Sequence, residues 1–259
     1  RWYRERGCRA EYIGHPYFDE LQGQQLDPAF LASVEDPQRP LVTILPGSRT
    51  QEVESNLTTF LKTAEQINRH APQVRYAIAA FNDSQAAYAR GAVDQAGLDI
   101  PIYVGRTGEL IRAAHSCLAC SGSVSLELLY HARPDVILYQ VGRFGFFVQQ
   151  FFRKVRYITL VNLLTADDPS TTRPAGNYDP TDPRDQHVLL PEYLTCTDKS
   201  SDLARHILHW VGSEGAYRER VEQLSRLRDA VGQGGASRRA ADFIVELLDP
   251  PCSLRSHAA

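Results

Sequence analysis

Two short turns hold the residues of this chain whose types and spacing fit anion binding. The first, Pro46-Gly47-Ser48-Arg49, lies between an apolar run and a helical pattern. Gly47 permits a tight turn, and Ser48 with Gln51 three residues later predicts a capping box that starts a helix at about Arg49. Free N–H groups at such a helix start attract an anion, and Arg49 adds a planar cation suited to phosphate. The alternative is a capped surface helix with a solvated arginine.

The second turn is Ser121-Gly122-Ser123, followed by Ser125 and Glu127. Small residues allow a ligand close to the backbone, and the hydroxyl and amide groups at a helix entry fit a diphosphate. The Glu127 carboxylate lies one turn further on, where it can accept hydrogen bonds from ribose hydroxyls. The alternative is a serine-capped helix in which Glu127 favours the positive end of the helix dipole. Two such turns on one sheet favour a nucleotide site.

A third turn, Val104-Gly105-Arg106, also lies between an apolar run and a helical pattern. Gly105 and Arg106 are candidates for lining a base pocket with backbone groups. An ordinary turn is the alternative.

The segment 143–156 combines five Phe with four basic residues. On a helix, Phe144, Phe147 and Phe151 share an apolar stripe, and Arg153 and Lys154 lie at its end. One interpretation is an amphipathic helix that faces the core. The other is a surface that touches lipid or anionic headgroups.

Cysteine and histidine spacing indicates no metal site and no nucleophile. Cys117 and Cys120 form a C-x-x-C without a second pair at ligand spacing, so we expect both to be buried strand residues. The histidines are scattered, without an H-E-x-x-H motif, and neither a G-x-S-x-G elbow nor a Walker loop is present.

The elements that position these turns alternate along the chain. Apolar runs predict strands at 41–45, 74–81, 102–104, 116–120, 135–140 and 157–160. Helical patterns lie between them, at about 53–67, 84–96, 110–114, 124–131 and 144–154. This alternation predicts the α/β class, with a doubly wound, Rossmann-like parallel sheet covered on both faces. Ligands of such sheets bind at the carboxyl ends of the strands, where the turns lie.

The flanking segments differ in composition from this layer. Residues 1–38 resemble the end of an upstream domain plus a linker, and residues 39–249 form the Rossmann-like domain. A Pro/Asp/Thr-rich insertion is expected at about 165–191, followed by helices at 200–211, 215–230 and 236–248 and a tail at 250–259.

Composition narrows the class of partner. The net charge of -3 gives no basic field that would recruit nucleic acid. No apolar run approaches the ~20 residues that span a bilayer. Five Cys, an odd number thinly spread, argue against a disulfide framework and fit a reducing cytoplasm.

Four strings in order carry a resemblance to a known family. They are Tyr12-Ile13-Gly14-His15-Pro16, then Leu45-Pro46-Gly47-Ser48-Arg49 with Glu52-Val53, then Ser121-Gly122-Ser123 with Leu126-Glu127, then Asn162-Leu163-Leu164. From about residue 10 to its last helix, the chain resembles the C-terminal half of lipid-A-disaccharide synthase, a GT-B glycosyltransferase. Two departures are Val161, where the family usually has proline before Asn162, and the long insertion before Pro191-Glu192-Tyr193-Leu194. Acceptor specificity is therefore expected to differ.

The resemblance implies a reaction and assigns roles to residues. The family transfers 2,3-diacylglucosamine from its UDP carrier to 2,3-diacylglucosamine 1-phosphate, forming a β-1,6 disaccharide and releasing UDP without a metal or other cofactor. Arg49 would stabilise the leaving diphosphate, which Ser121, Gly122 and Ser123 would hold. Glu127 would bind the ribose, and Asn162 would be a polar position of the site.

The resemblance also implies partners and a location. An absent N-terminal domain would carry the general base, so this chain alone is expected to be inactive. The aromatic–basic segment would bring acylated substrates from the cytoplasmic face of the inner membrane, where the enzyme would be peripheral. The alternatives are another GT-B enzyme acting on UDP-GlcNAc, whether glycosyltransferase or epimerase, and a non-catalytic module that binds a nucleotide sugar.

Overall fold

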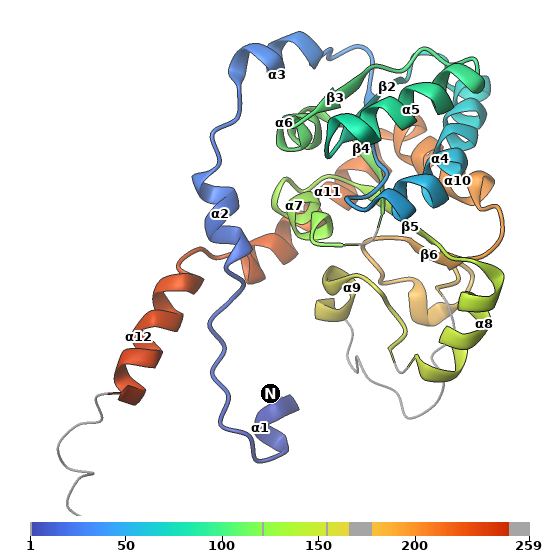
Figure 1. Cartoon of the computed structure of the whole chain (residues 1–259). Helices are drawn as coiled ribbons and strands as arrows, with labels where there is room; N and C mark the ends of the chain where they lie inside the picture. Colours follow the sequence, from blue (N-terminus) through green and yellow to red (C-terminus); the bar gives the residue numbers. More distant parts are fainter. Residues whose placement is uncertain (1, 121, 154, 166–177, 249–259) are drawn as a thin grey trace, which may run out of the picture. The chain divides into compact units, whose positions relative to one another are not determined.

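The computed structural model describes residues 2–120, 122–153, 155–165 and 178–248 (Figure 1). The chain forms two units, Leu26–Arg226 and a smaller one made of Arg1–Gln25 with Leu227–Ala259. The larger unit holds the sheet and all three predicted turns.

The sheet has six strands in the order β3-β2-β1-β4-β5-β6. They are β1 (Leu41–Leu45), β2 (Arg75–Ala80), β3 (Ile102–Val104), β4 (Ser116–Cys120), β5 (Asp135–Gln140) and β6 (Glu192–Thr195). All neighbouring pairs are parallel. This is the strand order of Rossmann-type layers, so the predicted doubly wound sheet is confirmed.

Helices cover both faces of the sheet, which explains the continuous apolar runs (Figure 1). Val42 and Ile44 face a core formed with α4 (Thr50–His70), α5 (Asp83–Gln95) and α10 (Ser200–Gly212). Thr43 points to the other face, where its hydroxyl donates to the Leu110 carbonyl of α6 (Thr107–Ala113) over 3.0 Å. The short helix α7 (Val124–Tyr130) packs beside α6. Cys117 and Cys120 are buried in β4, as predicted.

The remaining elements follow the predicted order, apart from a few helices that were not predicted and one strand that is wrong. The helices α8 (Arg143–Phe152), α11 (Glu214–Val231) and α12 (Ala236–Leu248) lie where helical patterns were expected. In the described ranges, the helices α1 (Trp2–Glu5), α2 (Tyr17–Gly23), α3 (Pro28–Val34) and α9 (Leu160–Thr165) are additional to the helical patterns given above. None of the helices in the described ranges is long and apolar enough to cross a membrane.

The strand predicted at 157–160 is wrong, because this segment turns and then enters α9. The N–H groups of Ile158 and Thr159 donate to the buried Glu192 carboxylate instead of a strand ladder, over 2.5 and 3.1 Å. The last strand is β6, which begins at Glu192 and pairs with β5.

Much of the predicted insertion, 166–177, lies outside the described residues. Ion pairs hold the end of the insertion in place. The Arg156 guanidinium donates to Asp185 and Asp182 and binds this end to the segment that follows α8. Asp185 also accepts a hydrogen bond of 2.8 Å from the Tyr157 hydroxyl. A short 3-10 turn, Pro183–Asp185, lies between β5 and β6 in the sequence.

In the smaller unit, the Asp19 carboxylate on α2 caps α12. It accepts hydrogen bonds from the amides of Gly235, Ala236 and Ser237. These hydrogen bonds, led by those from Ser237, lower the pKa of Asp19 to about 2. Residues at opposite ends of the chain are therefore joined in one unit. The tail predicted at 250–259 lies outside the described residues.

Candidate functional site

The candidate site lies at the carboxyl ends of β1 and β4, which are neighbours in the sheet. From β1 the chain winds towards β2 and β3, whereas from β4 it winds towards β5 and β6. This reversal is the topological switch point at which open α/β sheets bind ligands. The first two predicted turns follow these two strands. The structure therefore brings both turns to one edge, although Ser121 lies outside the described residues.

The first turn approaches its own helix closely at Gly47. Gly47 has a φ of +131°, and a Cβ at this position would lie 2.6 Å from the Glu52 Cβ. The Glu52 carboxylate accepts hydrogen bonds from the amides of Ser48 and Arg49, over 3.1 and 3.2 Å. The capping box predicted for Ser48 and Gln51 is therefore wrong, because Glu52 performs the capping and α4 begins at Thr50.

Arg49 is the exposed cation of this turn. Its side chain is 80% exposed, and one guanidinium nitrogen contacts Glu52 Oε1 at 2.8 Å. An exposed ion pair of this kind stabilises a fold by only about 0–1 kcal/mol. A guanidinium carries five N–H donors, so Arg49 can contact an anion while it keeps Glu52 as a partner.

Two buried amide side chains, those of Asn56 and Gln85, hold the backbone of the first turn in place. Asn56, which is fully buried on α4, donates to the Pro46 carbonyl over 3.3 Å. Its amide oxygen accepts from the Gln140 backbone N–H, at the end of β5, over 3.0 Å. Gln85, on α5, donates to the Ser48 carbonyl over 2.9 Å. The turn is thus preorganised by α4 and α5 before any ligand arrives.

The second turn presents Gly122 and Ser123 at the surface. Ser125 is buried, and its hydroxyl donates to the Gly122 carbonyl over 2.9 Å, so this hydroxyl shapes the turn. Glu127 is 6% exposed on α7. Because this carboxylate is buried, a ligand group would have to enter the turn to reach it.

At the third turn, Arg106 binds the segment of the same unit that contains Asp27 and Phe30. The Arg106 guanidinium contacts Asp27 at 3.1 Å and Glu109 at 3.0 Å, and it lies 4.9 Å from the centre of the Phe30 ring. The hydrogen bond to Glu109 and the charge of Asp27 raise the pKa of Arg106. Arg106 therefore fastens α3 to the turn, and Gly105, with a φ of +68°, remains exposed at its tip.

The side chain of Asn162 lies in a buried hydrogen-bond network. It is fully buried, and its side chain exchanges hydrogen bonds with the Leu190 N–H and carbonyl and donates to Glu192 over 2.9 Å. Burial raises the pKa of Glu192, although its four hydrogen bonds oppose the shift. Glu192 was not predicted as a partner of Asn162, because its signal in the sequence is just an acidic residue inside an apolar string.

The helix α8 exposes aromatic side chains close to the edge. Phe144 is 82% exposed and Phe147 60% exposed, whereas Arg153 is partly buried. The α8 interpretation as a core-facing helix does not fit these two Phe residues. The side chain of Phe151 and the whole of Lys154 lie outside what the structure describes.

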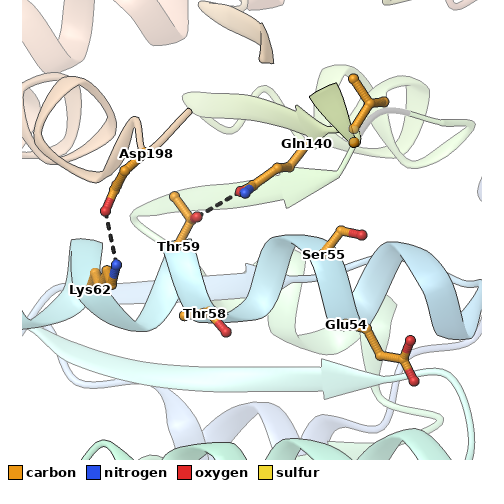
Figure 2. Close-up of a pocket in the computed structure, with 9 residues that line it drawn as sticks. Glu54, Ser55, Thr58, Thr59, Lys62, Gln140 and Asp198 are labelled. Carbon is orange, nitrogen blue, oxygen red and sulfur yellow. Dashed lines mark hydrogen bonds and ion pairs between the residues drawn. The ribbon is translucent and has the colours of Figure 1, made fainter. Parts of the chain in front are cut away.

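A polar hollow of about 380 Å³ lies between α4 and the turn from β5 to α8 (Figure 2). Figure 2 shows Ser55, Thr59 and Lys62 along the helix, with Gln140 opposite. Thr59 donates to Gln140 over 2.8 Å, and Lys62 donates to Asp198 over 3.0 Å. The backbone N–H of Gln140 also donates to Asn56, which binds the first turn. The lining of this hollow and the first turn are therefore connected through Asn56. The described residues contain no cluster of His, Cys, Asp or Glu suited to a metal.

Comparison with known families gives one consistent match. A family model described as "Lipid-A-disaccharide synthetase" matches residues 1–214. The lipid-A-disaccharide synthase of Pseudomonas putida KT2440 is 27% identical over 250 residues, covering 96% of this chain and 60% of the relative. That of Pseudomonas fluorescens Pf0-1 is 31% identical over 253 residues, with the same coverage. The chain thus spans about 60% of the length of these curated relatives.

Solved structures share the fold at low sequence identity. A Staphylococcus aureus MnaA–UDP structure has a TM-score of 0.57 and 10% identity over 91% of this chain and 54% of that one. WaaG, a glycosyltransferase involved in lipopolysaccharide biosynthesis, has a TM-score of 0.51 and 13% identity over 89% and 51%. These similarities concern the fold alone.

The geometry at Gly47 makes a specific prediction. Gly47→Ala should destabilise the protein by about 1–3 kcal/mol, because alanine must adopt a positive φ and its Cβ meets Glu52. Gly91→Ala is the matched control, since Gly91 lies in α5 and its added Cβ meets nothing within 4 Å. The control should gain up to about 1 kcal/mol. Urea unfolding compares the two variants, and equal stabilities would contradict the strained turn.

Proposed function

The chain belongs to the lipid-A-disaccharide synthase family, and we propose that it forms the donor-binding half of this glycosyltransferase. In the proposed reaction, 2,3-diacylglucosamine passes from its UDP carrier to 2,3-diacylglucosamine 1-phosphate. A β-1,6 disaccharide forms and UDP leaves. The observation that carries the proposal is the pair of turns, with the exposed Arg49, at the switch point of the sheet.

The chemistry requires charge stabilisation where UDP departs. The acceptor hydroxyl attacks the anomeric carbon of the donor and gives its proton to the general base, while the bond from that carbon to the diphosphate oxygen breaks and the electron pair stays on the diphosphate. Arg49 supplies a positive charge there, and the exposed backbone at Gly122 and Ser123 supplies room for close approach. Glu127 binds the ribose hydroxyls, while Asn162 hydrogen-bonds to Leu190 and Glu192 and so holds α9 against the start of β6.

We propose that the part of the family protein that this chain does not span binds the acceptor and supplies the general base. The chain matches about 60% of its relatives' length, so we propose that the remainder completes the cleft. The isolated chain should then bind UDP without transferring sugar.

A membrane surface is the second element of the proposal. Both substrates are acylated, and α8 exposes Phe144 and Phe147 beside the basic residue Arg143. Aromatic side chains next to basic groups bind the boundary between headgroups and acyl chains. We therefore propose that the enzyme is peripheral on the cytoplasmic face of the inner membrane.

Among the alternatives, the solved structures favour no single activity. UDP-GlcNAc 2-epimerases share the fold with TM-scores of 0.54, but at 11% and 9% identity. The family match, by contrast, extends through most of the larger unit. It favours the disaccharide synthase reaction over epimerisation and over a non-catalytic module.

The role of Arg49 is tested by UDP binding. Arg49→Ala should weaken UDP affinity by about 10–100-fold, because a hydrogen bond to a charged group contributes about 1.5–3 kcal/mol. Arg112→Ala, which removes another exposed arginine on α6, should bind UDP like the wild type. Calorimetric titration measures both, and identical affinities for the two variants would remove Arg49 from the site.

The membrane role of α8 is tested by sedimentation with vesicles containing anionic lipid. Phe144→Asp should reduce the bound fraction several-fold, since the side chain is 82% exposed and its replacement is charged. Tyr88→Asp, at another exposed aromatic residue, is the control. Unchanged vesicle binding by a folded Phe144→Asp variant would contradict the proposal.

A further inference from the structure

A buried carboxyl group lies at the amino end of β5, away from the proposed donor site. Asp135, the first residue of this strand, is 0% exposed, and neither of its carboxyl oxygens has a hydrogen-bond partner in the described part of the chain. Burying a charged carboxylate without a partner is far more costly than burying the neutral acid. The environment of Asp135 therefore favours the protonated form.

The neighbours of Asp135 in the sheet leave it without a donor. Thr43 on β1 pairs with Cys117 on β4, and Cys117 pairs with Asp135, so the three side chains share one face of the sheet. The Thr43 hydroxyl donates to the Leu110 carbonyl instead. Burial raises the pKa of the Cys117 thiol well above its usual value, and the Glu127 carboxylate on α7 adds to this shift. The thiol is therefore neutral beside Asp135.

Arg220 on α11 is the cation that acts on Asp135. Burial raises the pKa of Asp135 well above its usual value, and the charge of Arg220 opposes this shift. The Arg220 guanidinium is already engaged, because its Nη1 donates to the carbonyls of Val188 and Leu189 over 2.9 and 2.7 Å. These carbonyls belong to the segment that leads into β6, which begins at Glu192. Since Asp135 accepts no hydrogen bond, the guanidinium must move to reach it.

The other ionisable groups at this end of the sheet have partners of their own. Arg133 directly precedes Pro134 and β5, and its guanidinium donates to the Arg112 carbonyl over 2.6 Å. His115 directly precedes β4 and stacks on the Tyr217 ring of α11, with ring centres 4.1 Å apart. Burial lowers the pKa of His115 to about 4, so this ring is neutral at neutral pH. Arg220 is thus the cation placed to respond when Asp135 ionises.

We propose that Asp135 carries a proton in the folded protein and forms, with Arg220, a pH-sensitive latch on the segment that leads into β6. When the proton passes to solvent, the new carboxylate draws the Arg220 guanidinium towards it and away from Val188 and Leu189. The two carbonyls lose their donor, and the segment loosens at the β5–β6 edge of the sheet. The latch lies at the amino ends of the strands, so it is independent of UDP binding at their carboxyl ends.

The latch makes the fold less stable as pH rises. The folded protein retains the Asp135 proton to a higher pH than the unfolded chain does, because the folded pKa is raised. Between the two pKa values, the unfolding equilibrium constant should rise by about 10-fold per pH unit. The lowered pKa values of His115 and His206 act in the opposite direction below about pH 6.5. Their effect is shared by the wild type and an Asp135 variant, so a ratio of the two proteins removes it.

Urea unfolding between about pH 5 and pH 9 tests the proton on Asp135. The unfolding constant of the wild type, divided by that of Asp135→Asn, should rise by about 10-fold per pH unit until Asp135 ionises. Asp135→Leu is a second reference, because an apolar side chain of similar size suits a site without hydrogen-bond partners. Asp94→Asn, at an exposed position on α5, should give a constant ratio to the wild type.

Infrared spectra measure the proton directly. At about pH 6, where exposed aspartates are ionised, the wild type and Asp94→Asn should show a carboxylic-acid C=O band that Asp135→Asn lacks. A constant stability ratio for Asp135→Asn and Asp135→Leu, or the same acid band in all of these proteins, would overturn the proposal.

Hydrogen exchange tests the movement of Arg220. In the wild type, protection of the amides in 188–195 relative to those in β2 should fall several-fold as Asp135 ionises. In Asp135→Asn this relative protection should stay constant, because the neutral amide does not attract the guanidinium. A wild-type segment that keeps its relative protection through the pH range in which the stability ratio changes would overturn the latch.

Discussion

A single buried carboxamide holds together the edge on which the proposed site depends. Asn56 on α4 donates to Pro46 at the end of β1 and accepts from Gln140 at the end of β5. These strands are not neighbours, because β4 lies between them. Without this side chain, the buried Pro46 carbonyl and the partly buried Gln140 N–H would lack these partners, at a cost of about 1–3 kcal/mol for the buried group. Asn56 therefore sets the spacing between the first turn and the start of α8, on either side of the second turn.

The arginines of the larger unit differ in whether they stabilise the fold or are available to a ligand. Arg106 and Arg156 are committed to carboxylates of their own unit and hold α3 and the end of the insertion. Arg49 instead has 80% of its side chain exposed and one carboxylate partner in the same turn. A cation with spare donors beside a strained glycine turn is suited to an incoming diphosphate. Glu52 both caps α4 and orients this cation, so the start of the helix and the proposed anion site share one carboxylate.

The sequence predicted the sheet well because its strands are buried on both faces and read as uninterrupted apolar runs. The two turns were also predictable, because Gly and Ser between a strand and a helix favour a turn through their own local conformational preferences. The segment 157–160 was misassigned because its aromatic and β-branched residues have strand propensity, while its amides bind Glu192 more than 30 residues away. Asn56, Gln85 and Glu192 were missed for the same reason, because a buried polar residue is recognisable only by partners distant in sequence. The choice of Glu52 over Gln51 as the cap depended on the Gly47 backbone, which spacing alone does not determine.

We propose that UDP binds at the switch point, with its ribose at Glu127. Calorimetric titration of UDP into the wild type and Glu127→Gln tests this placement, with Glu219→Gln, an exposed position on α11, as the matched control. We expect the wild type and the control to bind equally. Glu127→Gln should bind about 10-fold more weakly, since it loses charge-assisted hydrogen bonds to the ribose. Equal binding of UDP by all three folded proteins would contradict the placement of the ribose at Glu127.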